Sequence, residues 1–224
     1  MVLVYTFLTM SRAIKYESMV DKTYDEIKRM ILTGELKSGE RLLFKEMVER
    51  LEVSPTPIKL AFTKLEKEGF VVSIPHRGTV VSEFSQKDVL EIFQIRESLE
   101  TLAVKLAAEY SSAKDIVLLR SINNRYKESI DARDMKKAIQ EDFHFHESLY
   151  KISDNKRLNR LMNFSNVQLV SIAEKSNDFF GNGKIYYENH AAIIDAIERR
   201  DGEEAQNRIK AHLEYALRQI LDTK

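Results

Sequence analysis

The residues best suited to chemistry in this sequence are histidines, and four of the five lie beyond residue 140. They occur in the segments EDFHFHESL, YYENHAAI and KAHLEYA. Asp142 and His146 are four residues apart, so on a helix their side chains share one face. His144 would point about 200° away from Asp142 on the same helix, so we expect it to be exposed or packed at an edge.

His190 and His212 lie at equal distances from a predicted turn. Each is eleven residues from Asp201, in the sequence Arg200-Asp201-Gly202 between two helical patterns. In an antiparallel helical hairpin, equal distance from the turn brings two side chains to the same height. Three imidazoles and one carboxylate can therefore converge, from Asp142, His146, His190 and His212. This set of ligands suits Zn²⁺, with Ni²⁺ or Mn²⁺ as alternatives. For any single histidine, a capping or core role is the commoner explanation.

The amino-acid composition excludes several kinds of site and indicates a globular protein. The 224 residues contain no cysteine, which excludes disulfides, iron–sulfur clusters and cysteine-based zinc sites. The hydrophobic content of 43% and the charged content of 31% are those of an ordinary globular protein. No apolar run approaches the ~18 residues that span a bilayer, so we expect no membrane partner. The net charge of +0 gives no overall attraction to nucleic acid.

Prolines and glycines divide the chain into two parts. All three prolines and four of the seven glycines precede residue 79. This asymmetry predicts a mainly α protein with a small mixed domain and a larger, almost purely helical one. We place an N-terminal extension at residues 1–16, the small domain at 17–84 and the helical domain at 85–224. The opening MVLVYTFLTM lacks the basic region and the cleavage site of a signal peptide, so we expect a cytoplasmic protein.

The helical domain begins where Ser85 can N-cap a helix that has Asp88 at its third position. Apolar periodicity predicts about six helices in it, at residues 86–110, 113–131, 134–152, 156–176, 184–200 and 202–222. The clearest turns are at Asp154-Asn155 and at Arg200-Asp201-Gly202.

The small domain reads as three helices followed by a hairpin. YDEIKRMIL and LFKEMVERL are amphipathic, and a third helix begins at Ser54, with Pro55 and Pro57 in its first turn. Only Glu52-Val53 separates the second helix from the third, which is the short connection of a helix-turn-helix. The β-branched runs FVVSI and TVVSEF then predict a two-stranded wing.

The order and spacing of these elements resemble a known family. The run SGERLLFKEMVERLEVSPTPIKLAFTKLEKEGFVVSIPHRGTVV looks like the winged helix-turn-helix of GntR-type bacterial transcriptional regulators. The helical remainder resembles the FCD ligand-binding domain of their FadR-like branch. Together the resemblance covers residues 20 to 224. It implies a regulator, in the first place a repressor, that binds a double-stranded operator as a homodimer. Metal-binding members of this branch show the same pattern, and their ligands match Asp142, His146, His190 and His212.

The resemblance also implies which residues contact DNA. These are Lys45 in the second helix, Ser54, Pro55, Thr56 and Lys59 in the third, and Arg77 and Gly78 at the tip of the wing. The family usually has arginine where this chain has Pro55 and Lys59. Because arginine reads guanine with two hydrogen bonds and lysine acts as a point charge, these departures predict an unusual or less stringent operator. The alternative is a winged helix that contacts protein.

Arg96, in FQIRESLE, matches the family's arginine on the first helix of the helical domain. The resemblance implies that it grips the carboxylate of a small effector beside the metal. The alternative is a buried ion pair with a helix such as residues 156–176.

Three functions stay open from the sequence. The first is a regulator that responds to a small carboxylate metabolite, and the second is a regulator for which the metal itself is the signal. The third is a metal-dependent hydrolase, since a site of this kind can activate water. Glu141 and Glu147 neighbour the ligands in sequence but would point away from them, so no general base is evident. We therefore expect no enzymatic activity.

Overall fold

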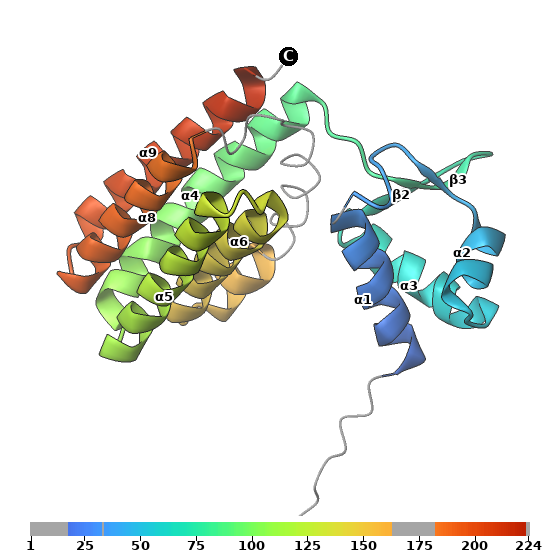
Figure 1. Ribbon diagram of the computed structural model, residues 1–224, viewed down its shortest axis with the longest axis horizontal. Helices are drawn as coiled ribbons and strands as arrows, with labels where there is room; N and C mark the ends of the chain where they lie inside the picture. The colour runs from blue at the N-terminus through green and yellow to red at the C-terminus, as the bar shows by residue number, and fades with distance from the viewer. Residues whose placement is uncertain (1–17, 33, 163–181, 223–224) are drawn as a thin grey trace, which may run out of the picture.

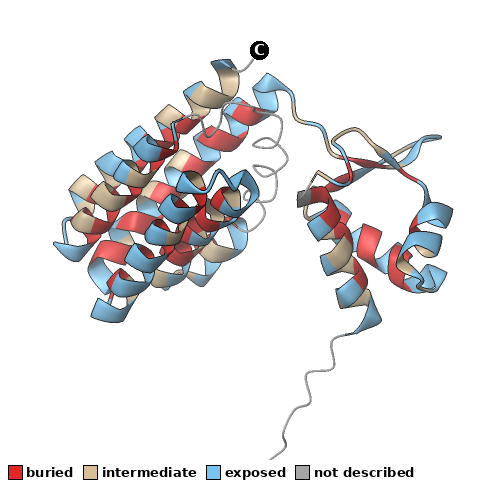
Figure 2. Ribbon diagram, viewed as in Figure 1, coloured by how far each residue is buried: buried red, intermediate tan, exposed pale blue. Residues whose placement is uncertain are grey.

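The computed structural model describes residues 18–32, 34–162 and 182–222, which form a small N-terminal domain and a helical C-terminal domain (Figure 1). The extension predicted at residues 1–16 lies outside the described residues. Buried apolar side chains form two separate clusters, one within residues 27–81 and the other within residues 89–216 (Figure 2). The mainly helical fold predicted from the sequence is confirmed. None of the helices in the described ranges combines the length and the apolar character needed to cross a bilayer.

The N-terminal domain consists of three helices and a small sheet. The elements are α1 (Met19–Leu32), β1 (Arg41–Leu42), α2 (Phe44–Leu51), α3 (Pro55–Lys67), β2 (Val71–Ile74) and β3 (Gly78–Val81). The sheet order is β1-β3-β2 and both pairings are antiparallel, with Val72 opposite Val80 in the hairpin. The predicted hairpin is therefore present. The sequence did not reveal β1, because two residues are too few to show strand alternation.

The turn between α2 and α3 fixes the start of the third helix. Glu52 adopts a left-handed conformation with φ of 52°, and Ser54 is extended at the N-cap position, as predicted. The hydroxyl of Ser54 makes no capping hydrogen bond. The reason is that the third helical position, whose N–H often receives such a bond, is Pro57, which has none.

The C-terminal domain is a bundle of antiparallel helices. They are α4 (Gln86–Tyr110), α5 (Ala113–Asp131), α6 (Met135–Ile152), α8 (Gly183–Glu198) and α9 (Gly202–Asp222), with residues 156–162 also helical. The ends of these five labelled helices lie within two residues of the predicted ones. The helix predicted at 156–176 lies partly outside the described residues. Capping boxes, Ser85 with Asp88 and Ser112 with Asp115, fix the starts of α4 and α5.

Two contacts align the ends of the bundle helices. Arg200, in the turn between α8 and α9, donates hydrogen bonds of 3.0, 2.5 and 2.7 Å to the carbonyl oxygens of Ala108, Glu109 and Ser111 at the end of α4. At the opposite end of the bundle, Gly183 begins α8 against Ile130 near the end of α5. A Cβ atom at Gly183 would lie 2.6 Å from Ile130 Cδ1. These contacts set the relative heights of α4, α5, α8 and α9.

We predict that Arg200→Ala destabilises the protein by about 1–2 kcal/mol, because it removes charge-assisted bonds to the last carbonyls of α4. The measurement is the free energy of unfolding from urea denaturation. Arg208→Ala is the matched control, since the one ion pair of Arg208 among the described residues is with Glu204 of its own helix, at the surface. Its effect should stay within about 0.5 kcal/mol. Equal losses in the two variants would contradict the assigned role of Arg200.

Candidate metal centre and nucleic-acid interface

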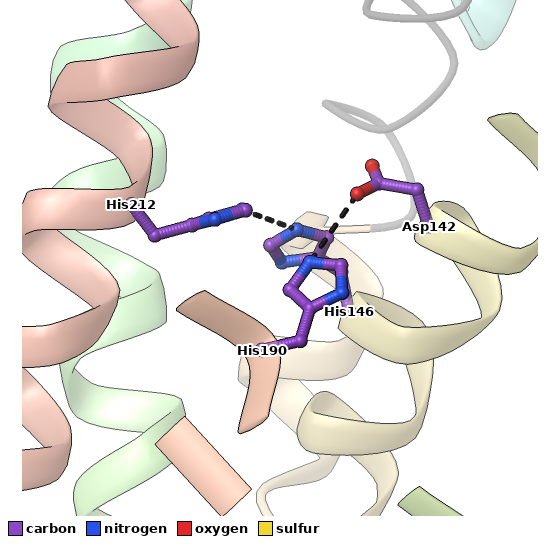
Figure 3. A group of neighbouring side chains, drawn as sticks. All are labelled: Asp142, His146, His190 and His212. Atoms are coloured by element: carbon purple, nitrogen blue, oxygen red, sulfur yellow. Dashed lines mark hydrogen bonds and ion pairs between the residues drawn. The ribbon is translucent and has the colours of Figure 1, made fainter. Parts of the chain in front are cut away.

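The four residues predicted to bind metal converge in the core of the helical domain (Figure 3). Asp142 and His146 come from α6, His190 from α8 and His212 from α9, and one ligand atom of each lies within 4.8 Å of the others. The three histidines are buried, and the side chain of Asp142 is 14% exposed. As predicted from their equal distance to Asp201, His190 and His212 lie side by side, and the centroids of their rings are 4.9 Å apart. We call these four residues the His/Asp cluster.

The closest distances in the His/Asp cluster are those expected between ligands of one metal. His190 Nε2 lies 3.3 Å from Asp142 Oδ1, and His212 Nε2 lies 3.2 Å from His146 Nε2. Two ligand atoms that each lie about 2.0–2.1 Å from a tetrahedral zinc are separated by about 3.3–3.4 Å. Only small movements would therefore be needed to place a cation between them.

Several polar atoms in the cluster are buried without a hydrogen bond. Asp142 Oδ1 and His190 Nε2 are close, but their geometry is not that of a hydrogen bond, and neither has another partner among the described residues. Buried polar atoms in folded proteins are nearly always satisfied. A shared cation would satisfy both atoms, so the residues present fit a metal.

The protonation states in the cluster also suit a cation. Burial lowers the pKa of His190, and burial together with the neighbouring imidazoles lowers the pKa of His212 well below its ordinary value. Both rings are therefore neutral near pH 7, as metal ligands must be. Burial alone would raise the pKa of Asp142, but its contacts with His190 and His146 outweigh burial and hold the pKa below the ordinary value. The carboxylate is therefore ionised.

A buried carboxylate orients His146. Its Nδ1 lies 2.7 Å from Glu100 Oε2 on α4. An ionised carboxylate only accepts, so Nδ1 carries the proton and Nε2 is left as the ligand atom. Glu100 Oε1 accepts hydrogen bonds from Arg96 Nε at 2.7 Å and from the Tyr150 hydroxyl at 2.9 Å. Burial would raise the pKa of Glu100, but Arg96 and His146 outweigh it and lower the pKa to about 2.

An asparagine orients His190 in the same way. Asn123 Nδ2 on α5 donates to the carbonyl oxygen of Tyr187 at 3.0 Å, which leaves Oδ1 to face His190 Nδ1 at 3.3 Å. His190 Nδ1 is therefore the donor, and Nε2 faces Asp142. Sequence analysis identified neither Asn123 nor Glu100. For Glu100 a signal existed, since it follows Arg96 by four residues and so shares its helix face.

The histidine and the two glutamates that neighbour the α6 ligands in sequence, His144, Glu141 and Glu147, point away from the cluster, as predicted. The side chain of His144 is 56% exposed and lies 3.5 Å from Glu141, which pairs with Arg125. Glu147 pairs with Lys151 on the same helix. No glutamate next to the ligands in sequence is therefore placed to act as a base at the cluster.

Arg96 is buried, with an exposed fraction of 5%. Among the described residues, Arg96 forms an ion pair with Glu100 of the same helix, and most of the segment 156–176 considered for its alternative role lies outside the described residues. The guanidinium has five N–H donors, so the contacts from Nε and Nη2 to Glu100 do not use all of them. The effector role of Arg96 stays a prediction.

The residues predicted to contact DNA are all exposed on the N-terminal domain: Lys45, Ser54, Pro55, Thr56, Lys59, Arg77 and Gly78. Gly78 has φ of 79° where β3 leaves the hairpin turn. Proline has no N–H, so Pro55 and Pro57 leave the first turn of α3 with two fewer backbone donors for a phosphate than a usual helix start. The hydroxyls of Ser54 and Thr56 are the remaining side-chain donors there. The DNA contacts themselves stay predictions.

Comparison with known proteins finds two family models along the chain. The model of the bacterial regulatory proteins of the gntR family matches residues 19–81, and the FCD domain model matches residues 91–215. The chain is 30% identical over 207 residues to the transcriptional regulator LutR of Bacillus subtilis, covering 82% of this chain and 93% of LutR. It is 28% identical to a probable D-xylose utilization operon transcriptional repressor of Paenarthrobacter nicotinovorans, covering 91% and 89% of the two chains. The solved structure of Escherichia coli McbR/YncC shares the fold, with a TM-score of 0.80 at 22% identity over 91% of this chain and 97% of that one.

We predict that metal raises the melting temperature and that the cluster histidines are needed for this increase. A metal that binds only the folded protein stabilises it by ~2.7 kcal/mol at 100 times its dissociation constant, which is about 5–11 °C for a chain of this size. His190→Ala or His212→Ala should remove most of the increase. His144→Ala, which alters an exposed histidine two residues from His146, should keep it. Calorimetry of metal-stripped and reloaded samples measures the effect. If all three variants respond like the parent, the histidines are structural.

Proposed function

The chain belongs to the GntR family of bacterial regulatory proteins and carries an FCD domain, and on this basis we propose that it is a ligand-controlled repressor. It is a DNA-binding transcriptional regulator. We propose further that its C-terminal domain holds a divalent metal and a small organic acid, and that the bound acid changes the affinity for an operator. The observation that carries the metal proposal is the convergence of three imidazole nitrogens and one carboxylate oxygen within 4.8 Å of one another.

Zinc is the metal that this donor set favours, with nickel or manganese as alternatives. The ligands would be Asp142 and the Nε2 atoms of His146, His190 and His212. A bound zinc would supply a positive, Lewis-acidic position for a carboxylate oxygen. The positive charge of Arg96 interacts with the negative charge of Asp142. Because both groups are buried, electrostatic interactions at this position are stronger than they would be in water. If an acid were held between the metal and Arg96, both oxygens of its carboxylate would therefore face a positive charge.

The operator would be contacted through α3 and the wing of a cytoplasmic homodimer. A two-fold dimer calls for a (pseudo)palindrome whose half-sites lie about one helical turn apart, roughly 34 Å. Three relatives whose names include the word repressor support repression as the direction of control: the P. nicotinovorans protein, NanR of Enterobacter sp. and RspR of Escherichia coli. Ligand binding in the C-terminal domain would change the relative placement of the two DNA-binding heads.

Two alternative functions differ from the proposed one in their chemistry. In the first, the metal alone is the signal and no organic acid takes part. Titrating metal against operator binding, with and without added acids, separates this function from the proposed one. The second, a metal-dependent hydrolase, lacks support because Glu141 and Glu147 are paired with residues away from the cluster.

We predict that DNA binding depends on the positive charges of α3 and the wing. Lys59→Ala and Arg77→Ala should each weaken operator binding, and each should reduce its salt dependence by about one unit if the target is a phosphate. Lys67→Ala, at the other end of α3, is the matched control and should leave the salt dependence unchanged. The measurement is fluorescence anisotropy across a salt series. Selection from genomic fragments supplies the operator, and a selection that enriches no sequence would count against the proposal.

We predict that Arg96→Lys abolishes the response to acids but keeps the metal. Lysine preserves a positive charge beside Glu100, and it lacks the planar fork that holds a carboxylate through two hydrogen bonds. Operator affinity should be measured with mono- and dicarboxylic acids, alongside the metal content. If the variant loses both its metal and its fold, Arg96 is a structural ion-pair residue only.

A further inference from the structure

The exposed side of α3 carries one large apolar side chain. The buried residues of this helix, which pack into the core of the N-terminal domain, are Pro57, Ile58, Ala61, Phe62 and Leu65. On the exposed side, Leu60 is 46% exposed, and the charged side chains of Lys59 and Lys64 lie near it in the sequence. Nearly half of the leucine therefore adds nothing to the hydrophobic core, and its apolar surface is left open to a partner.

Leu60 lies beside the first turn of α3. It follows Thr56 by four residues, so the two side chains share one face of the helix. Side chains on a helix lean toward its N-terminus, so Leu60 covers the turn that contains Thr56. In a helix-turn-helix, the N-terminal residues of the second helix contact base edges in the major groove. Leu60 is therefore next to the part of α3 that would face the bases.

The sequence of α3 contains few side chains that can identify a purine by hydrogen bonds. Arginine or lysine makes paired contacts with guanine, and asparagine or glutamine makes them with adenine. The helix, PTPIKLAFTKLEK, has no arginine, asparagine or glutamine. Pro55 and Lys59 occupy the positions at which the family usually has arginine. In the first seven residues of the helix, Thr56 and Lys59 are the only side chains that can donate a hydrogen bond.

The next polar side chains along α3 are engaged within the protein. The Thr63 hydroxyl donates to the carbonyl oxygen of Lys59 at 3.0 Å, so its proton is not available to a base. Lys64 Nζ lies 2.5 Å from Asp21 Oδ1 on α1. Hydrogen bonding from α3 to base edges is therefore limited to its first two turns, where Leu60 supplies the apolar surface.

An apolar side chain can distinguish one base in the major groove. Thymine presents a methyl group there, at C5, whereas the edges of the other three bases present hydrogen-bonding groups and no methyl. A leucine packed against this methyl removes apolar surface of both partners from water. The same leucine against a hydrogen-bonding edge would leave polar atoms without a partner. Leu60 is therefore chemically suited to thymine.

We propose that Leu60 contacts a thymine methyl group in the major groove of the operator and so sets part of its sequence. This inference rests on the proposed function, because α3 must enter the major groove, and it names what the helix reads there. Lys59, one residue away, would supply positive charge to the phosphates beside the contact. In a two-fold dimer the contact occurs once in each half-site, so the operator should carry a thymine at the same place in both.

The test removes the methyl group from the DNA and leaves the rest of the operator unchanged. A duplex enriched by selection from random sequences is synthesised with thymidine and, at one position of each half-site at a time, with deoxyuridine, which lacks only the methyl. Fluorescence anisotropy with the full-length protein gives both affinities. At one position the change should weaken binding about fourfold for each half-site, the effect of burying one methyl group. Thymines outside the half-sites should show no effect.

A second change to the DNA supplies the methyl without thymine. Replacing the contacted thymine·adenine pair by cytosine·guanine should weaken binding. Methylating that cytosine at C5 places a methyl at the same point of the groove, and it should recover about fourfold in affinity for each half-site. This comparison separates the methyl from the hydrogen-bonding groups of the pair.

Variants of the protein assign the preference to one side chain. Leu60→Ala should abolish the preference for thymidine over deoxyuridine, whereas Leu60→Met, which keeps a long apolar side chain, should retain it. Leu118→Ala is the matched control, because Leu118 is also 46% exposed but lies on α5 of the helical domain. Its ratio of the two affinities should equal that of the parent. The melting temperature confirms that each variant is folded.

The contrary outcomes separate this inference from the proposed function. Equal affinities for thymidine and deoxyuridine at every position of the half-sites, or a preference that Leu60→Ala retains, would overturn the role of Leu60 and leave operator binding in place. If the selection enriches no sequence, the inference fails together with the operator half of the proposed function.

Discussion

The helical domain depends on the hydrogen bonds that the buried carboxylate of Glu100 accepts. This carboxylate accepts hydrogen bonds from Arg96, His146 and Tyr150, and so joins α4 to α6 at the point where the cluster forms. An ion pair removed from water seldom adds net stability, because the desolvation of both charges offsets their attraction. What it supplies here is a fixed orientation: with Nδ1 committed to Glu100, His146 can turn only Nε2 toward the other ligands. The same constraint explains why Arg96 is buried rather than presented at a surface.

The geometry of the site then follows from helix ends rather than from the ligands themselves. Arg200 ties the turn between α8 and α9 to the end of α4, and Gly183 lets α8 begin against α5. With both ends of the bundle fixed, residues one turn apart on neighbouring helices fall into successive levels. His190 and His212 lie at one such level, and Asp142, one turn before His146 on α6, reaches the same group of ligand atoms. A polar interior of this kind is stable only when its groups are satisfied, so the unsatisfied buried atoms of the cluster support a bound metal.

Local patterns predicted most of this fold, and the exceptions have physical causes. Apolar periodicity and the capping residue Ser85 report on nearest neighbours, so the limits of the five labelled C-terminal helices were predicted within two residues. The convergence of His190 and His212 was predictable because one turn relates them. Glu100 and Asn123 were missed because their partners lie 46 and 67 residues away, and on a helix each reads as an ordinary polar position. β1 was missed because its two residues are ordered only by pairing with β3.

The two prolines at the start of α3 have a consequence for the chain before it folds. Their rings hold φ near −65° in every conformation, so this turn has fewer states to lose on ordering than a turn without proline. Ser54 shares that restriction, because a residue before proline is confined to the extended region, and Ser54 is extended here. The geometry of this turn is therefore set in advance. In the proposed contact of α3 with DNA, little of the contact free energy would be lost to immobilising the backbone.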